Sequence, residues 1–219
     1  MDCTCNRWLF KIVLFCVLAF AHTVTFIVFK FVQINGHYPF SQTLAVVIVE
    51  TVKLCISLVL HKHVSKTFKL QRVTCREFLS YVGLACMYTS NNIFTFFLLN
   101  ETDPGTLIAF KSMAPFICAI MLRIIGEHIN TLQYGCIILQ CCALGILKTD
   151  SDGTVDKNQP YVLLVLSVLV TATSSVWNQR VMQKANRGFH EQNIILYACG
   201  TCTGLIAFFI LPNEVPVTD

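Results

Sequence analysis

The amino-acid sequence predicts an all-α fold, a polytopic membrane bundle of seven spans, on three observations. The chain of 219 residues is 55% hydrophobic and 13% charged, and its mean hydropathy is +0.64. These values are typical of membrane proteins. Seven apolar stretches reach the ~20 residues with which a helix crosses the ~30 Å hydrocarbon core. The connections between the stretches are alternately basic and acidic.

The predicted spans follow one another along the whole chain. They cover residues 8–32, 40–60, 78–99, 104–125, 130–148, 160–184 and 193–211. Few charges interrupt them, which disfavours a soluble globular fold. The first stretch has no small-residue cleavage site and is longer than the apolar region of a signal peptide, so we expect it to remain as an anchor.

Lys and Arg are unevenly distributed between the two sides of the predicted bundle. Eleven of the 16 fall on the side that holds the N-terminus, and three fall on the other side among four Asp residues and one Glu residue. Because cytosolic loops carry the excess of positive charge, we expect a cytosolic N-terminus, with Asp219 on the lumenal or external side. The net charge of +4 then requires no nucleic-acid partner.

The twelve cysteines do not indicate a disulfide scaffold. Nine lie within predicted spans, where cysteine acts as a small apolar residue. Cys3 and Cys5 form a C-x-C pair, but a zinc site would need two further ligands, and none lies nearby in the sequence. Palmitoylation of this pair is favoured over metal binding. We expect neither a metal nor a cofactor.

The second span holds Glu50 and Lys53, which share a helix face because they are three residues apart. Placing a charged side chain against lipid costs free energy, so we expect both to face the protein interior or a water-filled path. Two interpretations remain open. The pair could hold helices together, or Lys53 could contact an anionic substrate. We favour the second, because charges within spans are usually functional.

The third span contains Tyr88 followed by Asn91 and Asn92. Two adjacent Asn residues cannot share one narrow helix face, so at least one must bond to another helix or to a ligand. An amide both donates and accepts hydrogen bonds, which suits a base edge or a sugar. Amides also join membrane helices to each other, and the sequence does not decide between these two roles.

The fourth span begins at Pro104, which follows Asp103 in a typical helix start. Pro115 removes a backbone hydrogen bond and is expected to kink the helix. Kinked helices line the cavities of secondary transporters. Lys111 lies about two turns inside the span, and we favour an inward-facing role for it over snorkelling to the surface.

The last two spans add further polar side chains. The sixth ends in small hydroxyl residues that begin at Thr171 and permit close approach of helices. Trp177 near its end fits an aromatic belt at the membrane interface. The seventh begins with Asn193, and Tyr197 lies one turn further on the same face.

Enzyme motifs are absent from the sequence: it contains no Walker A, G-x-S-x-G, H-E-x-x-H or G-x-G-x-x-G pattern. The polar groups within the spans are cations, amides, hydroxyls and tyrosines. They suit the binding of a phosphorylated, hydroxyl-rich ligand better than its conversion. We therefore expect the protein not to be an enzyme.

These polar residues resemble, in their order and spacing, those of the nucleotide-sugar transporters. More narrowly they resemble the CMP-sialic acid and UDP-galactose transporter branch of the drug/metabolite transporter superfamily. The matching motifs are Glu50-Thr-Val-Lys53, Tyr88-x-x-Asn91-Asn92, Asp103-Pro-Gly-Thr106, Ser174-Ser-Val and Gln192-Asn193-x-x-x-Tyr197.

The resemblance implies a ten-span fold of two inverted five-helix repeats. Residues 1–150 would form the first repeat, and residues 151–219 would begin the second. It also implies the Golgi membrane as the location, with the endoplasmic reticulum as the alternative. The implied activity is antiport of a cytosolic nucleotide sugar against a lumenal nucleoside monophosphate.

The resemblance further implies a substrate-binding set. It comprises Lys53, Tyr88, Asn91, Asn92, Lys111, Thr171, Asn193 and Tyr197. The family usually has Tyr-Gln near the start of the fourth span and Leu-Lys before its proline, where this chain has Leu107-Ile108 and Met113-Ala114. Lys111 is expected to compensate for the missing lysine. The resemblance does not identify the nucleotide sugar.

Two hypotheses follow, because seven spans end the second repeat after two helices. In the first, the chain is a transporter or a truncated form of one, and its partners are the bilayer, a nucleotide sugar and a nucleoside monophosphate. In the second, it is a non-transporting Golgi protein that scaffolds glycosyltransferases or related transporters as a homo- or hetero-oligomer. A seven-helix receptor is disfavoured by the cytosolic N-terminus. We expect no exchange by the 219-residue chain alone.

Overall fold

The computed structural model describes residues 2–34, 38–65, 72–102, 104–127, 130–148, 160–184 and 187–211. Within these ranges the chain forms α-helices and no β-strand, which confirms the predicted all-α class. The helices are α1 (Asp2–Phe31), α2 (Gln42–Ser65), α3 (Cys75–Glu101), α4 (Pro104–Lys111), α5 (Ala114–Ile124), α6 (Thr131–Lys148), α7 (Tyr161–Lys184) and α8 (Phe189–Ile210).

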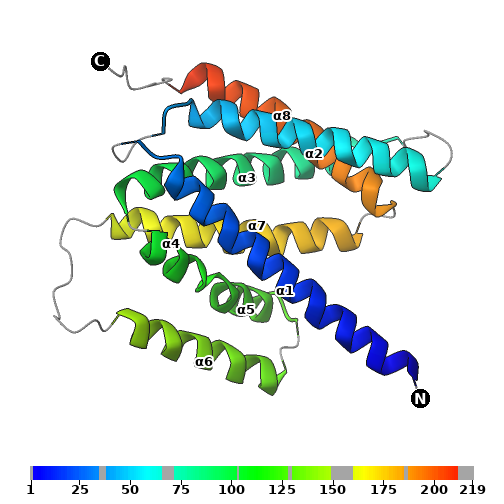
Figure 1. Ribbon diagram of the computed structural model, residues 1–219. Coiled ribbons are helices and arrows are strands. Elements are labelled where there is room, and N and C mark those ends of the chain that lie inside the picture. The colour runs from blue at the N-terminus through cyan, green and yellow to red at the C-terminus, as the bar shows by residue number, and fades with distance from the viewer. Residues whose placement is uncertain are drawn as a thin grey trace. The chain divides into compact units, whose positions relative to one another are not determined.

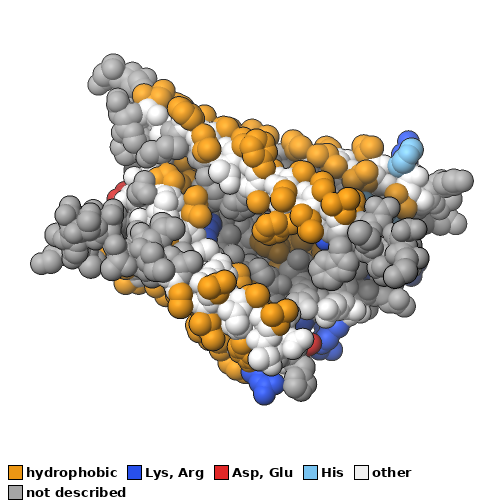
Figure 2. All heavy atoms as spheres, turned by 60° about the horizontal axis from the view of Figure 1, so that its bottom comes forward, with side chains coloured by type: hydrophobic (Ala, Val, Ile, Leu, Met, Phe, Trp, Pro, Cys, Tyr) orange, Lys and Arg blue, Asp and Glu red, His pale blue; other side chains and the backbone are white. Residues whose placement is uncertain are grey.

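Six segments of the described chain are long and apolar enough to cross a membrane. They lie in α1, α2, α3, the α4–α5 pair, α7 and α8, at six of the seven predicted positions. At the remaining position α6 forms a helix whose described apolar part, Thr131–Cys142, is shorter than a span. The helices, together with the apolar side chains that dominate the described surface in Figure 2, make the chain a multi-pass membrane protein.

Two compact units make up the fold. The first contains α1, whose described side chains are mostly apolar. The second spans Phe40–Glu214 and contains α2 to α8. In this second unit α7 and α8 pack against α2, α3 and α5 (Figure 1). The helices that begin the expected second repeat thus interleave with those of the first.

Helices α2 and α8 run side by side because two glycines of α8 let them approach closely (Figure 1). A Cβ atom at Gly204 would lie 3.1 Å from Cγ2 of Val47, and one at Gly200 would lie 2.9 Å from Oε2 of Glu50. The two glycines form a G-x-x-x-G motif, which brings membrane helices together through van der Waals packing. This motif fixes the face of α2 that carries Glu50 against α8.

Helix α3 packs between α8 and α7. On the α8 side, buried Tyr81 and Leu84 contact a cluster that includes Leu196. On the α7 side, a Cβ atom at Gly83 would lie 3.0 Å from the ring of Trp177, so this indole rests directly on the α3 backbone. Its ring therefore packs between helices as well as reaching the surface.

The fourth span breaks in its middle, as the position of Pro115 predicts. The chain is helical to Lys111, turns through Ser112 and Met113, and resumes as α5. The backbone N–H of Phe116 bonds to the Met113 carbonyl, which leaves the Ser112 carbonyl without its helical donor. Nε2 of Gln140 in α6 donates to that carbonyl at 2.7 Å. A side chain from a neighbouring helix thus satisfies the backbone group that the break exposes.

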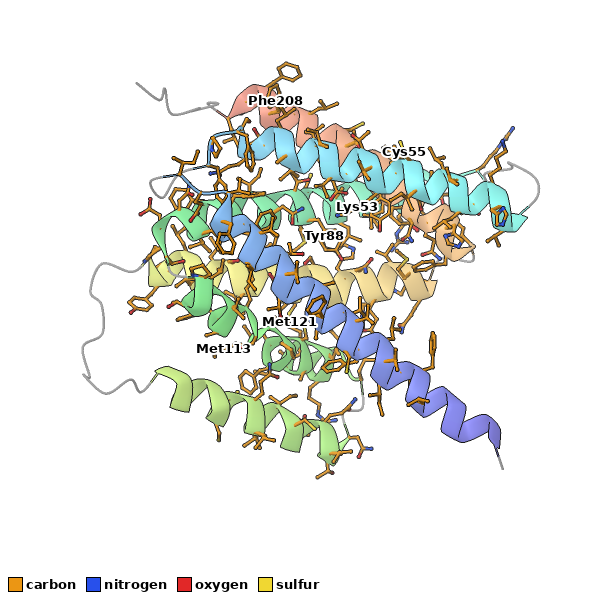
Figure 3. The ribbon with its side chains drawn as sticks, viewed as in Figure 1. Lys53, Cys55, Tyr88, Met113, Met121 and Phe208 are labelled. Atoms are coloured by element: carbon orange, nitrogen blue, oxygen red, sulfur yellow. The ribbon has the colours of Figure 1, made fainter. Side chains whose placement is uncertain are left out.

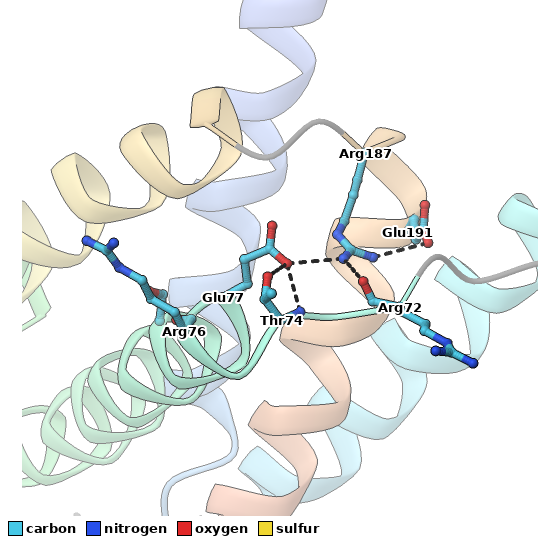
Figure 4. A network of polar contacts seen from close by, with 7 residues as sticks. Arg72, Thr74, Arg76, Glu77, Arg187 and Glu191 are labelled. Atoms are coloured by element: carbon cyan, nitrogen blue, oxygen red, sulfur yellow. Dashed lines mark hydrogen bonds and ion pairs between the residues drawn. The ribbon is translucent and has the colours of Figure 1, made fainter.

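A buried arginine ties together the two basic connections of the second unit (Figure 4). Arg187, whose side chain is 5% exposed, lies 3.1 Å from Oε2 of Glu77 and 3.5 Å from Oε1 of Glu191. It also donates to the backbone carbonyl of Arg72. Glu77 in turn accepts from Thr74 in a capping box that starts α3. The α2–α3 and α7–α8 connections are therefore held at the same end of the bundle.

Candidate functional site

A cavity of about 330 Å³ lies between α2, α3, α7 and α8. It is large enough for a small organic ligand, since such sites usually measure ~300–1,000 Å³. Eight of its lining residues carry polar groups. The lining residues are Glu50, Lys53, Ala85, Tyr88, Thr89, Asn92, Asn178, Met182, Phe189, Asn193, Leu196, Tyr197 and Gly200.

The charge of the cavity comes from Glu50 and Lys53 on one face of α2. Nζ of Lys53 lies 2.8 Å from Oε1 of Glu50, so the two form an ion pair. Their surroundings differ, because the side chain of Glu50 is 8% exposed and that of Lys53 is 43% exposed. Gly200 leaves room for the carboxylate against α8. Glu50 is thus enclosed by protein, while the ammonium group of Lys53 remains accessible to a ligand.

Two tyrosines surround the ammonium group. Nζ of Lys53 lies 5.8 Å from the ring centroid of Tyr197 on α8, within the range of a cation–π contact. Tyr88 on α3 lines the same cavity, and Figure 3 shows it close to Lys53. Aromatic faces beside a cation can stack on a planar ring while the cation binds an attached anionic group.

Three amides complete the polar lining: Asn92 from α3, Asn178 from α7 and Asn193 from α8. Oδ1 of Asn178 is buried and accepts no hydrogen bond from the described residues. A buried amide oxygen without a donor is costly, so it favours a ligand that donates a hydrogen bond. Thr89 adds a hydroxyl, which bonds at 3.0 Å to Thr203 of α8 and links α3 to that helix.

The structure brings five of the eight predicted site residues to this cavity. They are Lys53, Tyr88, Asn92, Asn193 and Tyr197. The other three, Asn91, Lys111 and Thr171, do not line it. Oγ1 of Thr171 donates to Oδ1 of Asn91 at 2.8 Å, which joins α7 to α3. Nζ of Lys111 donates to Oγ1 of Thr95, which joins the end of α4 to α3.

The two adjacent asparagines therefore have different surroundings. Asn92 faces the cavity, and Asn91 bonds to another helix. Lys111 points inward rather than snorkelling to the surface, as its position two turns inside the span indicates, but its partner is Thr95. Lys53 pairs with Glu50 on the same helix and also lines the cavity, so contact of Lys53 with an anionic substrate stays a prediction.

Sequence reasoning missed Asn178 and Gly200 as parts of the site. Asn178 had a visible signal, because an amide near the end of an apolar helix is costly unless it faces protein or water. Gly200 also had one, since it begins a G-x-x-x-G motif within an apolar stretch. Neither signal reveals by itself which neighbouring helix the residue faces.

Comparison with known proteins finds transporters of nucleotide sugars. The chain is 23% identical over 218 residues to "CMP-sialic acid transporter 2" of Oryza sativa, which covers 94% of this chain and 60% of that protein. It is 23% identical to "CMP-sialic acid transporter 4" of Arabidopsis thaliana, over 93% of this chain and 61% of that protein. It is 22% identical to "Probable UDP-sugar transporter protein SLC35A4" of Xenopus tropicalis, over 80% of this chain and 58% of that protein.

These relatives are transporters rather than enzymes, and they confirm the resemblance to the nucleotide-sugar transporter family. The chain spans about 60% of the length of the curated relatives that it matches. No family model matches the chain.

Proposed function

We propose that this chain binds a nucleotide sugar, and the nucleoside monophosphate exchanged for it, in the cavity between α2, α3, α7 and α8. The observation that carries the proposal is the accessible ammonium group of Lys53, set among two tyrosines and three amides inside an apolar bundle. A nucleotide sugar offers the matching groups: an anionic phosphate, a planar base and hydroxyl groups. The similarity to proteins named as nucleotide-sugar transporters supports this ligand class.

In this proposal Lys53 binds the phosphate, and the tyrosines and amides bind the base and the sugar. Without ligand, Glu50 neutralises Lys53, which lowers the cost of holding a cation within the membrane. With ligand, the phosphate competes for Lys53 on its accessible side, while Glu50 remains enclosed against Gly200. Antiport by alternating access, a Golgi location and a cytosolic N-terminus complete the proposal. Oligomers with related transporters or glycosyltransferases belong to the scaffold hypothesis.

The first test is nucleotide binding by the purified chain in detergent. A nucleoside monophosphate at 100 times its dissociation constant adds ~2.7 kcal/mol to stability, which corresponds to a rise in Tm of about 5–11 °C for a chain of this size. We expect Lys53→Ala to abolish this rise. Lys111→Ala is the matched control, because it removes a cation of the same bundle that does not line the cavity.

The second test measures exchange in proteoliposomes by a transport-competent ten-span form that contains this sequence, because we expect no exchange by the 219 residues alone. Lys53→Ala should stop exchange at near-normal expression, and replacing both Glu50 and Lys53 by leucine should not restore it. Restored exchange in the double variant would show that Lys53 serves only to neutralise Glu50. Equal nucleotide binding by the parent and Lys53→Ala would overturn the proposed phosphate site.

A further inference from the structure

A second hollow, of about 430 Å³, lies between the first turns of α3 and the last turns of α7. It is separate from the cavity described above and shares no lining residue with it. We refer to it as the basic groove. Its lining residues are Arg76, Glu77, Ser80, Tyr81, Trp177, Arg180, Val181 and Lys184.

The basic groove presents an excess of positive charge. Arg76 comes from α3, and Arg180 and Lys184 share a face of α7 because they are four residues apart. In the part of the chain that the structure describes, no carboxylate forms an ion pair with any of these three cations. Glu77, the acidic group of the lining, is bonded to Arg187, and Figure 4 shows Arg76 pointing away from that network.

Two further features indicate that the groove accepts a ligand. Tyr81 is 1% exposed, and its buried hydroxyl has no hydrogen-bond partner among the described residues. A hydroxyl that is buried without a partner carries an energetic cost that a bound acceptor would remove. Trp177 forms one wall, and its ring is held in place by contact with the backbone at Gly83.

The position of the groove indicates a membrane lipid rather than a soluble anion. Arg76 lies in the first turn of one candidate span and Lys184 in the last turn of another, which is the depth of lipid head groups. Phe78 and Leu79 on α3 have strongly exposed apolar side chains. This exposure is expected of a helix that contacts acyl chains. Tryptophan is enriched at this interface.

We propose that the basic groove binds the phosphate-bearing head group of an anionic phospholipid. The positive-inside rule places this end of the bundle in the cytosolic leaflet, where anionic lipids are concentrated and where basic pockets between spans bind them. Arg76 and Arg180 clamp the phosphate with planar guanidinium groups, the hydroxyl of Tyr81 donates to it, and Trp177 borders the glycerol region. This inference does not depend on the nucleotide-sugar proposal.

Trp177 makes the proposal testable by fluorescence. The chain has two tryptophans, so Trp8→Phe leaves Trp177 as the single reporter in the groove. The Trp8→Phe chain is reconstituted into vesicles of phosphatidylcholine mixed with brominated phosphatidylcholine, brominated phosphatidylserine or brominated phosphatidylinositol phosphate. Bromine quenches tryptophan only on contact, so quenching reports the lipid that occupies the groove. We expect the anionic lipids to associate about five- to tenfold more strongly than phosphatidylcholine.

Charge variants distinguish a specific lipid site in the groove from general electrostatic attraction of anionic lipids to the protein. Arg76→Gln with Arg180→Gln should abolish the preference for anionic lipid over phosphatidylcholine. Lys62→Gln with Arg123→Gln is the matched control, because it removes two exposed cations on the same predicted side outside the groove and should keep the preference. Arg76→Lys with Arg180→Lys tests the fold, since it keeps the charge and should retain most of the preference.

Three outcomes would overturn the proposal. The parent could show no preference, or both charge-removed variants could lose it equally, which would mean diffuse attraction. Inorganic phosphate or a nucleoside monophosphate at 1–10 mM could abolish the preference, which would assign the groove to a soluble anion. Binding of nucleotide in the detergent assay is measured separately, so failure here leaves the nucleotide site standing.

Discussion

A single methyl group added to α8 tests how the cavity is built. Gly200→Ala would place a Cβ atom 2.9 Å from Oε2 and 3.4 Å from Cδ of Glu50. Ordinary contact begins near 3.4 Å, so the carboxylate must retreat by about 0.5 Å. Glu50 is poorly placed to do so, because its side chain is 8% exposed and bonded to Lys53 at 2.8 Å. Either that ion pair lengthens or α2 moves away from α8.

Two opposing effects determine how much Gly200→Ala changes the free energy of unfolding. Replacing glycine by alanine inside a helix gains ~1 kcal/mol in propensity, and overpacking a fixed site costs ~1–3 kcal/mol. At Gly200 the cost is larger, and we expect a net loss of roughly 1–2 kcal/mol, or about 2–8 °C in Tm. Gly204→Ala is the control. A Cβ atom there would lie 3.1 Å from Cγ2 of Val47 and would contact no charged group. The gain in helix propensity and the cost of overpacking should therefore nearly cancel.

The assay combines thermal unfolding with the nucleotide-dependent rise in Tm. Gly200→Ala should lose stability and weaken the nucleotide effect, while Gly204→Ala should keep both. Shortening the acid relieves the contact, so Gly200→Ala combined with Glu50→Asp should be more stable than the sum of the single losses, by ~1 kcal/mol. A Gly200→Ala chain as stable as the parent, with unchanged nucleotide response, would refute the packing of Glu50 against α8.

Three further predictions concern the helix break, the buried arginine and the topology. Gln140→Leu leaves the backbone carbonyl at the α4–α5 break without its donor and should cost ~1–3 kcal/mol in the free energy of unfolding, measured by thermal unfolding against Tyr134→Leu at an exposed position of the same helix. Arg187→Ala removes the cation that pairs with the buried carboxylate of Glu191 and should cost ~3–5 kcal/mol in the free energy of unfolding, whereas Lys62→Ala at an exposed position should change Tm little; equal effects would argue against a structural role for Arg187. A tag at the N-terminus should be cut by protease added outside sealed vesicles with native orientation, and protection of that tag would reverse the proposed orientation.

The helices could be predicted from the sequence because their signals are local. Length and hydropathy place six spans within a few residues of the observed helices. Pro104 begins α4 as its fixed backbone angle favours, and Pro115 breaks the fourth span because it lacks an N–H group. The fifth predicted span, residues 130–148, coincides with α6. Helix α6 forms where expected, but its described apolar part is shorter than a span.

The composition of the site was harder to predict, because it depends on the neighbour that each face meets. Asn91 and Asn92 have identical side chains one residue apart, and only the placement of α7 gives Asn91 a partner in Thr171. Lys111 looked like a ligand for phosphate by its charge, yet Thr95 of α3 lies within bonding distance of it. Such pairings join residues that are far apart in the sequence and leave no local pattern.

The pairing of polar groups separates the two roles that intramembrane polar residues can have. Within apolar helices every polar group needs a partner, so a group whose partner lies on a neighbouring helix serves packing. Asn91, Lys111 and Gln140 have such partners among the described residues, and a ligand-binding role for Asn91 and Lys111 stays a prediction. Asn178 retains a buried oxygen without a donor, and Lys53 has an accessible side beyond its bond to Glu50. Because an unmet group in the bilayer is costly, these two positions are where a ligand gains most by binding, which is why the nucleotide tests centre on this cavity.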